Sequence, residues 1–354
     1  MAKIAIVGAG LMGTATAWPL ADNNHTIRLV GTHLDAEAIK SCKEKHFHPR
    51  LRRKLPQGVE PFYVEEIARA LDGVDIIVSG VNSWGVHWIG KTIGPHLKPG
   101  QLIIAVTKGL ETDESGELVI LPDALASELP EAIRDRVSLA AIGGPCIAGE
   151  LAGRHQTCVA FGSRDPDAVK LLSSAFRTPY YHVRPTTDLL GLELCAALKN
   201  AYTLGVGLAS GILEKSGGVD EAEAYMHNMA AATFGQATAE MERLLEIKGA
   251  TRSFAYSLPG CGDMYVTCMG GRTVRLGKLI GSGRTYEEAR NIMAGETLES
   301  VAIIGTMSRA LPRMVERGLI ERDELPLMRA LIDLIVLKKP IDLPLDAFFS
   351  NIGM

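Results

Sequence analysis

Short apolar runs alternate with helical patterns through the first half of the chain, whereas helical patterns dominate the second half. Helical windows at 64–71 and 118–128 lie between several of the apolar runs. Such alternation predicts crossover units, and therefore a mostly parallel sheet with helices on both faces. The predicted strands are Ile4–Val7, Thr26–Val30, Val74–Val81, Gln101–Thr107, Val137–Ile142 and Thr157–Phe161.

The strand pattern fades after about Arg184, and from Thr187 onward the chain reads as helices punctuated by Gly and Pro. With 354 residues the chain is also too long for one typical hydrophobic core. We therefore predict an α/β domain over residues 1–187, with a doubly wound sheet, followed by an all-α domain over residues 188–354.

A glycine motif at the start of the chain predicts dinucleotide binding. The first apolar run leads directly into Gly8-x-Gly10-x-x-Gly13, with Leu11 and Met12 in the turn, and a helical pattern follows. The first glycine permits a tight turn, the second lets a pyrophosphate approach the backbone, and the third lets helix and strand pack closely. Amide groups at the helix start then face the phosphates. The strand before the motif and the helix after it favour a Rossmann-type domain over an ordinary glycine-rich turn.

The end of the second predicted strand bears on the choice of nicotinamide cofactor. An acidic residue about 20 residues beyond the glycines normally accepts from the ribose 2′-hydroxyl of NAD. Here the strand ends in Gly31-Thr32-His33, and the first carboxylate is Asp35. Thr32 and His33 could tolerate a 2′-phosphate, which favours NADP or dual use. An Asp35 side chain that folds back toward the ribose would favour NAD.

Composition and charge argue against several classes of partner. The chain has 37 basic and 41 acidic residues, without a long run of either sign, which argues against nucleic acid and membrane surfaces. Apolar stretches are too short to cross a bilayer. The nine histidines and six scattered cysteines show no metal-ligand spacing, so we predict no metal and free thiols in a reducing cytoplasm. The basic segment 46–54 is most simply a solvated loop, with phosphate contact as the alternative.

Two polar segments of the second half stand out as candidates for chemistry. Lys199 and Asn200 lie in an almost wholly apolar helical window. Such a lysine either extends to the surface or lies in a site where its ammonium donates a proton to a carbonyl oxygen. Residues 258–275 form two glycine-rich turns around a polar stretch, with Arg272 and Arg275 after the second. These arginines could clamp a phosphate or simply end a surface loop.

Five segments, in order along almost the whole chain, match the motifs of one known family. The segments are Gly8-Ala-Gly-Leu-Met-Gly-Thr-Ala15, Thr107-Lys-Gly-Leu-Glu111, Gly144-Pro-Cys-Ile-Ala-Gly-Glu150, Ala197-Leu-Lys-Asn200, and Gly260-Cys-Gly-Asp263 with Thr267-Cys268. Each motif alone is modest evidence, but together they resemble the NAD(P)-dependent glycerol-3-phosphate dehydrogenase family.

The resemblance implies an oxidoreductase that transfers a hydride reversibly between NAD(P)H and C2 of dihydroxyacetone phosphate. It implies that Lys199 is the general acid and base, with Lys108 as a second cation and Asp263 orienting the lysine. The implied substrate-binding residues are Asn200, Thr267, Gly271, Arg272 and Thr273. The implied cofactor-binding residues are Gly8, Gly10, Leu11, Met12, Gly13, Thr32, His33, Lys108, Ala148, Arg272 and Glu296.

Departures from the family pattern leave the substrate open. Thr273 and Val274 follow Arg272 where the family has asparagine. Val81-Asn82-Ser83-Trp84 stands where bacterial members read Val-Pro-Ser, and Gly295-Glu296-Thr297 stands where a Glu-Gly pair is common. These changes fit a dehydrogenase of another small ketose or polyol phosphate equally well. A non-catalytic, redox-sensing NAD(P)-binding protein is a third reading, which the retained lysines and aspartate disfavour. Family similarity and the frequency of symmetric dimers favour a homodimer.

Overall fold

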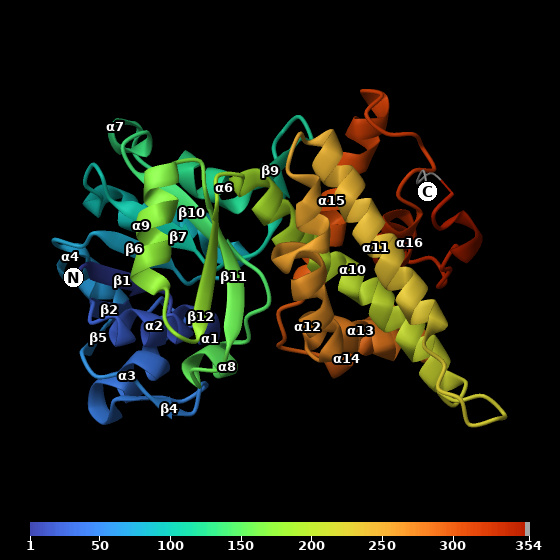
Figure 1. Ribbon diagram of the computed structural model, residues 1–354, viewed down its shortest axis with the longest axis horizontal. Coiled ribbons are helices and arrows are strands. Elements are labelled where there is room, and N and C mark those ends of the chain that lie inside the picture. Colours follow the sequence, from blue (N-terminus) through green and yellow to red (C-terminus); the bar gives the residue numbers. More distant parts are fainter. Residues whose placement is uncertain (351–354) are drawn as a thin grey trace. The chain divides into compact units, whose positions relative to one another are not determined.

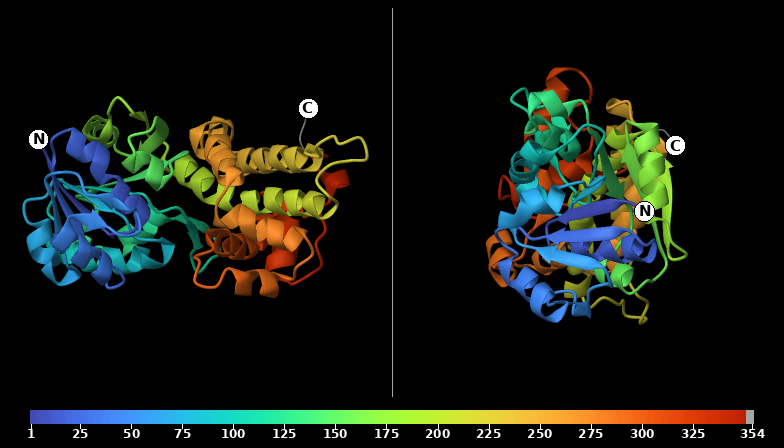
Figure 2. Two further views of the ribbon diagram at one scale, coloured as in Figure 1. Left: turned by 90° about the horizontal axis from the view of Figure 1, so that it is seen from below. Right: turned by 90° about the vertical axis from the view of Figure 1, so that its left-hand side faces the viewer.

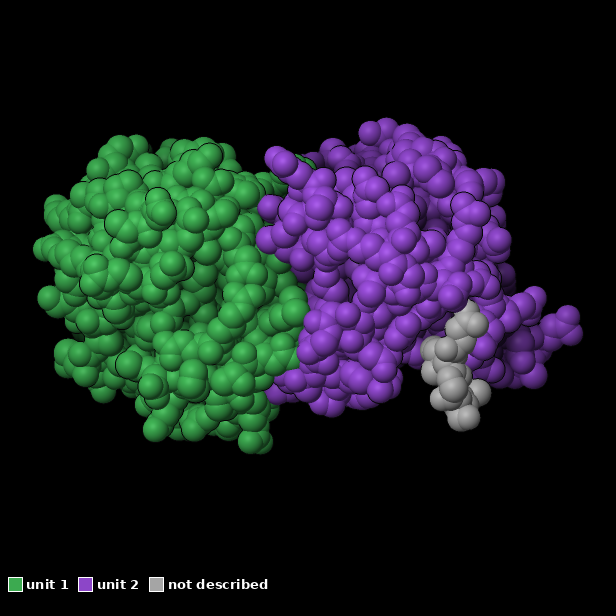
Figure 3. Space-filling model, turned by 90° about the horizontal axis from the view of Figure 1, so that it is seen from above, with its two compact units in different colours: residues 1–108, 120–193 green, residues 109–119, 194–354 purple. Residues whose placement is uncertain are grey.

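The computed structural model describes residues 1–350 and divides the chain into two compact units (Figure 3). Unit 1 comprises residues 1–108 and 120–193, and unit 2 comprises residues 109–119 and 194–354. The division predicted between residues 187 and 188 stays a prediction. The contacts within the chain instead separate the units at residues 193 and 194, and they assign the short segment after Lys108 to unit 2.

Unit 1 contains the predicted, mostly parallel sheet (Figure 1). All neighbouring strands run parallel except β10 and β11, which are antiparallel. The six predicted strands are confirmed, with ends that differ by up to two residues, whereas β5 and β12 are not among the predicted strands. In sheet order the strands are β12 (Tyr181–Thr186), β11 (Thr157–Ser163), β10 (Ser138–Gly143), β7 (Leu102–Ala105), β6 (Ile76–Ser79), β1 (Lys3–Val7), β2 (Thr26–Val30) and β5 (Val59–Phe62).

Both faces of this sheet are buried, as expected for a doubly wound fold. Along β1, Ile4 and Ile6 belong to one core cluster with Trp18 and Leu172 from helices, while Ala5 and Val7 are equally buried on the opposite face. Strand side chains alternate between faces, so helices must cover the sheet on both sides. The unit 1 helices are α1 (Leu11–Ala15), α2 (Ala17–Asp22), α3 (Ala36–Lys45), α4 (Ile67–Leu71), α5 (Val86–Ile93), α6 (Leu121–Ser127), α7 (Glu131–Arg134), α8 (Ala148–Ala152) and α9 (Pro166–Phe176).

Two local predictions in unit 1 are wrong. The window 118–128 is not one helix, because residues 118–120 form β9 (Leu118–Ile120), which pairs with β8 (Leu110–Thr112) before α6 begins. The basic segment 46–54 is not a solvated loop throughout, because it forms a hairpin of β3 (Phe47–His48) and β4 (Arg53–Lys54) in which His48 is fully buried. In both cases a short strand pairing replaces the local expectation.

Unit 2 is built on two long helices that lie side by side (Figure 2). Helix α10 (Leu189–Lys215), whose first turn belongs to unit 1, is joined to α11 (Asn228–Ile247) by a hydrogen bond from the Tyr202 hydroxyl to the Glu240 carboxylate at 3.0 Å. The remaining helices are α12 (Asp263–Met269), α13 (Arg272–Gly281), α14 (Tyr286–Ile292), α15 (Glu299–Glu316) and α16 (Pro326–Ile335).

Helices α10 and α13 pack backbone against backbone through four glycines. Gly207 and Gly211 lie one turn apart on α10, and Gly277 and Gly281 lie one turn apart on α13. A Cβ atom at any of the four would stand 2.2–2.6 Å from a carbonyl oxygen of the facing helix. Only glycine permits this approach, because a backbone carbonyl cannot move aside as a flexible side chain can.

We expect Gly277→Ala to lower the free energy of unfolding by about 1 to 3 kcal/mol or more, as overpacking does in a close-packed interior. Its Cβ would meet the Leu204 carbonyl oxygen at 2.4 Å. Gly305→Ala in α15 is the matched control, because its Cβ would have no neighbour within 4 Å. The control should be neutral or more stable by about 0.5 to 1 kcal/mol. Urea unfolding compares them, and equal stability of the two variants would contradict the packing argument.

Candidate active site

The three glycines of the turn in unit 1 have the separate roles that the sequence predicts. A Cβ on Gly8 would stand 2.6 Å from the Gly80 backbone, and a Cβ on Gly13 would stand 2.6 Å from the Gly8 carbonyl oxygen. A Cβ on Gly10 would meet only the Gly80 carbonyl oxygen, at 3.6 Å. The first and third glycines are therefore required by the protein itself, whereas the second leaves open backbone that a pyrophosphate can approach.

Ala9, within this turn, is held through both of its backbone polar groups. Its N–H donates to Asp35 Oδ2 at 3.1 Å, and its carbonyl lies 2.9 Å from His48 Nε2. The same Asp35 oxygen accepts from the backbone N–H and the hydroxyl of Thr32, at 2.9 and 2.8 Å. Asp35 thus folds back onto the glycine turn and Thr32. One of its two carboxylate oxygens already has three donors within the protein.

The other predicted cofactor residues of unit 1 line the ends of its strands and the loops beyond them. The His33 ring packs edge-on against Trp88, with ring centroids 5.5 Å apart. Leu11 is partly exposed at the start of α1, and Ala148 is the first residue of α8. The Lys108 ammonium, after β7, donates to the Gly144 carbonyl oxygen at 3.4 Å. β1 and β7 are parallel members of one sheet, so these groups share its carboxyl-terminal edge, where such folds bind ligands.

The central cluster of unit 2 joins three predicted site residues. The Lys199 ammonium lies 3.0 Å from Asp263 Oδ1 and donates to the Thr267 hydroxyl at 2.8 Å. The Thr267 hydroxyl in turn donates to the Asp263 carbonyl oxygen at 2.6 Å. The side chains of Lys199 and Asp263 are only 7% and 3% exposed. The alternative in which Lys199 extends to the surface is therefore wrong.

Asn200, the next residue on α10, carries a buried donor with no partner. Its Nδ2 atom has no hydrogen-bond partner among residues 1–350. Buried donors in native proteins are nearly always bonded, so an orphaned amide on the residue after Lys199 is a candidate partner for a ligand oxygen. The orphaned amide fits the predicted substrate-binding role.

The glycine-rich segment before α12 provides the geometry for Asp263. Residues 258–262 form one π-helical turn that leads directly into α12, and such turns are frequent at functional sites. A Cβ on Gly260 would stand 2.3 Å from the Ala255 carbonyl oxygen, so this turn requires glycine. Asp263 and Thr267 then lie one turn apart on α12, on the same helical face, toward Lys199.

The arginines that begin α13 are paired with carboxylates. Arg272 lies 3.3 Å from Glu299, at the start of α15, and Arg275 lies 2.9 Å from Glu296. Glu299 is a partner that the sequence analysis missed, since nothing in its spacing marks it. Glu296, predicted to bind cofactor, contacts Arg275. Gly271 has φ of 121°, a left-handed conformation that favours glycine.

The residues that depart from the family pattern have structural roles. The Asn82 side chain accepts from the Gly85 N–H at 3.1 Å and thereby caps the turn that precedes α5. Thr273 and Val274 are each only 5% exposed, and the Val274 carbonyl faces Gly207 in the α10–α13 contact. Local capping and helix packing therefore account for Asn82 and Val274 without any change of substrate.

Comparisons with known proteins agree with this geometry. Residues 3–169 match the family model of the NAD-dependent glycerol-3-phosphate dehydrogenase N-terminus, and residues 188–345 match that of its C-terminus. The NADP(+)-dependent glycerol-3-phosphate dehydrogenase of Archaeoglobus fulgidus is 37% identical over 286 residues, 81% of this chain and 82% of that protein. Glycerol-3-phosphate dehydrogenase [NAD(P)+] of Geobacillus kaustophilus is 31% identical over 99% of this chain and 95% of its own length.

A solved structure shares the fold. Glycerol-3-phosphate dehydrogenase from Coxiella burnetii superimposes with a TM-score of 0.80 at 23% identity, over 99% of each chain. This chain belongs to the NAD-dependent glycerol-3-phosphate dehydrogenase family. It is therefore an NAD(P)-dependent oxidoreductase acting on CH–OH groups, whose reaction is the reversible interconversion of dihydroxyacetone phosphate and glycerol 3-phosphate.

Within this dehydrogenase, residues 1–350 contain no cluster of three or more His, Cys, Asp or Glu side chains that could hold a metal ion. None of the helices described over that range is long and apolar enough to cross a membrane. All six cysteines lie within the described residues, and none of them forms a disulfide bond there.

Two fully buried glutamates of the dehydrogenase differ sharply in their surroundings. The Glu240 carboxylate accepts hydrogen bonds from Tyr202 Oη, Gln236 Nε2 and the N–H groups of Leu327 and Met328, at 2.7–3.0 Å, and so caps the start of α16. Neither carboxyl oxygen of Glu193 has a hydrogen-bond partner among residues 1–350. Burial raises the pKa of Glu193 to about 8, opposed by the Lys108 ammonium and assisted by Asp123.

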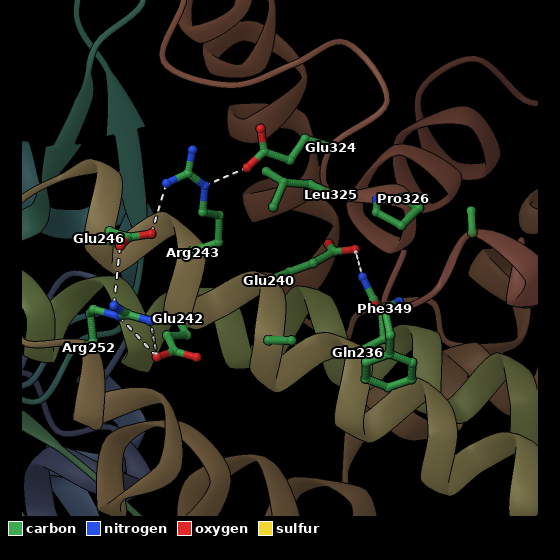
Figure 4. A pocket seen from close by; sticks show the side chains of 12 residues that line it. Gln236, Glu240, Glu242, Arg243, Glu246, Arg252, Glu324, Leu325, Pro326 and Phe349 are labelled. Atoms are coloured by element: carbon green, nitrogen blue, oxygen red, sulfur yellow. Dashed lines mark hydrogen bonds and ion pairs between the residues drawn. The ribbon is translucent and has the colours of Figure 1, made fainter. Parts of the chain in front are cut away.

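A cavity of about 200 Å³ beside Glu240 is lined by two arginines and four glutamates (Figure 4). Arg243 bonds to Glu324 and Glu246 at 2.5 and 2.8 Å, and Arg252 bonds to Glu242 at 2.8 Å. Lys199, Asp263 and Thr267 do not line it, so the cavity is separate from the cluster around Lys199.

Glu193→Gln should stabilise the protein increasingly as the pH rises. The carboxyl has a folded pKa of about 8 against about 4.5 when unfolded, so the native state holds a proton that the unfolded state releases between these values. The wild type therefore keeps its stability relative to the Glu193→Gln variant below about pH 4.5 and loses it as the pH rises toward 8. Each pKa unit corresponds to about 1.4 kcal/mol, giving an upper bound of about 5 kcal/mol.

Thermal unfolding of wild type and Glu193→Gln at several pH values between 5 and 8 measures this effect. Glu288→Gln is the control, because the hydrogen bonds from Thr285 hold the pKa of that exposed carboxyl below its usual value. Its difference from wild type should stay constant from pH 6 to 8. A difference for Glu193→Gln that does not grow with pH would refute a protonated Glu193.

Proposed function

We propose that Lys199 is the general acid and base of glycerol-3-phosphate dehydrogenase activity in this chain. The observation that carries the proposal is the buried ammonium held by Asp263 and Thr267, and the next residue on the helix, Asn200, has an orphaned buried amide. Asp263 balances the buried positive charge, without which burial of an ammonium would be costly. Thr267 accepts from the ammonium and fixes its direction.

The reaction needs a proton at the substrate oxygen and a hydride at C2. When bound, the nicotinamide supplies or accepts the hydride. In reduction, Lys199 donates a proton to the C2 oxygen as negative charge develops there, and in oxidation its neutral amine removes the hydroxyl proton. The amide of Asn200 donates to a substrate oxygen, and Lys108 adds a second positive charge. Arg272, with Gly271 and Thr273 at the start of α13, binds the substrate phosphate.

We further propose NADP(H) as the preferred cofactor. One oxygen of Asp35 is occupied by Ala9 and Thr32, which weakens its capacity to accept from a ribose hydroxyl. The β3–β4 hairpin, attached to the glycine turn through His48, exposes Arg50, Arg52 and Arg53, which can attract a 2′-phosphate. The related Archaeoglobus fulgidus protein is named as NADP(+)-dependent.

The proposal extends to the state of the protein in the cell. Six cysteines that form no disulfide bond within residues 1–350 suit a reducing cytoplasm. A homodimer is proposed from the prevalence of twofold assemblies. Another ketose or polyol phosphate is the second candidate substrate. It is favoured by Thr273, whereas Asn82 and Val274, the other two residues that favour it, have structural roles.

Lys199→Met should lower kcat for dihydroxyacetone phosphate reduction by about 10² to 10⁴, the usual contribution of a positioned acid. Absorbance of the reduced nicotinamide follows the reaction, and fluorescence titration checks that NADPH still binds. Thr267→Val removes one acceptor of the ammonium and should cost about tenfold, by the loss of one charged hydrogen bond. Turnover of Lys199→Met at the wild-type rate would refute the assignment, and a wild-type enzyme inactive with this substrate would direct the assay to other ketose phosphates.

The cofactor proposal predicts a higher kcat/KM with NADPH than with NADH. The triple variant Arg50→Ser, Arg52→Ser, Arg53→Ser should lose most of this preference while its kcat/KM with NADH changes little, because only the 2′-phosphate is lost as a partner. The variant Arg284→Ser, an exposed arginine in unit 2, serves as a charge control. Equal efficiency of the wild type with both cofactors would contradict the proposal.

A further inference from the structure

His48 is the buried histidine of unit 1 that no step of the proposed reaction uses. Its ring lies in the β3–β4 hairpin, fully buried, and bridges two backbone groups far apart in sequence. The Leu51 N–H lies 3.1 Å from Nδ1, and the Ala9 carbonyl oxygen lies 2.9 Å from Nε2. A backbone N–H can only donate, so Nδ1 is the acceptor. The proton is therefore on Nε2, which donates to Ala9.

This tautomer is also the one that burial favours. Burial lowers the pKa of His48, so the ring stays neutral, and a neutral ring has one donor and one acceptor nitrogen. Both nitrogens then have the partner that their protonation requires. The ring is fully satisfied without any ligand, so its contribution must come through the groups that it holds.

The groups held are the two peptides between the first two glycines of the cofactor turn. The Ala9 N–H, in the Gly8–Ala9 peptide, donates to Asp35 at 3.1 Å, and the Ala9 carbonyl, in the Ala9–Gly10 peptide, accepts from His48 at 2.9 Å. Gly8 has φ of 114° and its N–H donates to the Val30 carbonyl at 2.8 Å, so the turn is also fixed where it leaves the strand. Each of the two peptides is therefore held by its own hydrogen bond, and rotation of either one would break that bond.

We propose that His48 is a positioning residue for the cofactor. Together with Asp35 it holds the two peptide groups of Ala9, so that the glycine turn keeps the shape that receives the pyrophosphate. The inference rests on the proposed cofactor role of the turn. It adds that affinity depends on a residue of the basic hairpin that does not itself touch the ligand. Fixing the turn before binding lowers the ordering cost that the ligand would otherwise have to meet.

Two substitutions separate this role from simple support of the hairpin. Glutamine places an amide nitrogen near the position of Nε2 and keeps a donor for Ala9. Asparagine places its oxygen near the position of Nδ1 and keeps an acceptor for Leu51, but does not reach Ala9. His48→Asn should raise the Kd for NADPH about tenfold or more, whereas His48→Gln should stay within about threefold of wild type. Titration of NADPH fluorescence measures both, and thermal unfolding records the stability of each.

His46→Asn is the matched control, because His46 lies in the same hairpin region and bonds to the Pro56 carbonyl at 3.2 Å, away from the glycine turn. Asparagine tolerates the left-handed backbone of this position, φ 51°. Its Kd for NADPH should equal that of wild type. If His48→Asn does not fold, Asp35→Ala, which releases the Ala9 N–H instead, should raise the Kd in the same way.

Equal Kd values for the two His48 variants, or wild-type NADPH affinity in a folded His48→Asn or Asp35→Ala protein, would overturn the proposal. A further readout is kinetic: His48→Asn should raise KM for NADPH, with kcat at saturating NADPH and KM for dihydroxyacetone phosphate unchanged. NADPH binding is measured without turnover. A wild type that binds NADPH but does not reduce dihydroxyacetone phosphate would therefore refute the proposed reaction while leaving the role of His48 to be decided by its own variants.

Discussion

The backbone contact between α10 and α13 is the constraint on which unit 2 depends. Four glycines allow the two helices to approach so closely that a Cβ at any of them would overlap a carbonyl of the other helix. Lys199 lies two turns before Gly207 on α10, and Arg272 begins α13. The contact therefore holds Lys199, the proposed acid and base, and Arg272, the proposed phosphate ligand, on one closely packed pair of helices. A catalytic geometry needs such support, because small displacements of positioned groups cost large factors in rate.

Buried charge in this protein follows two patterns. Glu240 has a complete set of donors and ties α10, α11 and α16 together, which is a structural use of a carboxylate. Lys199 and Asp263 compensate each other, and Asn200, which carries the orphaned amide, follows Lys199 in the sequence. Neither carboxyl oxygen of Glu193 has a hydrogen-bond partner in the described part of the chain, and its raised pKa is the expected response. A buried carboxyl group with a full set of donors thus supports the scaffold, whereas one without donors retains its proton.

The sequence predicts most of the fold, because the spacing of apolar residues and the positions of glycines reflect local structure. The strands of the parallel sheet and the glycine turn follow from apolar runs and from residues that only a tight turn requires. The Lys199–Asp263 pair was expected through family resemblance, since 64 positions separate the two residues and no local pattern connects them. Glu299 beside Arg272 and His48 beside Ala9 were missed for the same reason: long-range partners leave no periodic signal.

Asp35 follows the second strand of the dinucleotide motif, but one of its oxygens contacts the protein itself. Its position after β2 is where a dinucleotide fold supplies an acceptor for ribose. Here one oxygen accepts from three protein donors, among them the Ala9 N–H, while His48 lies against the Ala9 carbonyl. An oxygen that already accepts within the protein is a poorer acceptor for a ligand hydroxyl, which leaves that task to the other oxygen of the carboxylate. In the two proposals made above, the shape of the turn and the choice of cofactor are therefore linked through the same carboxylate.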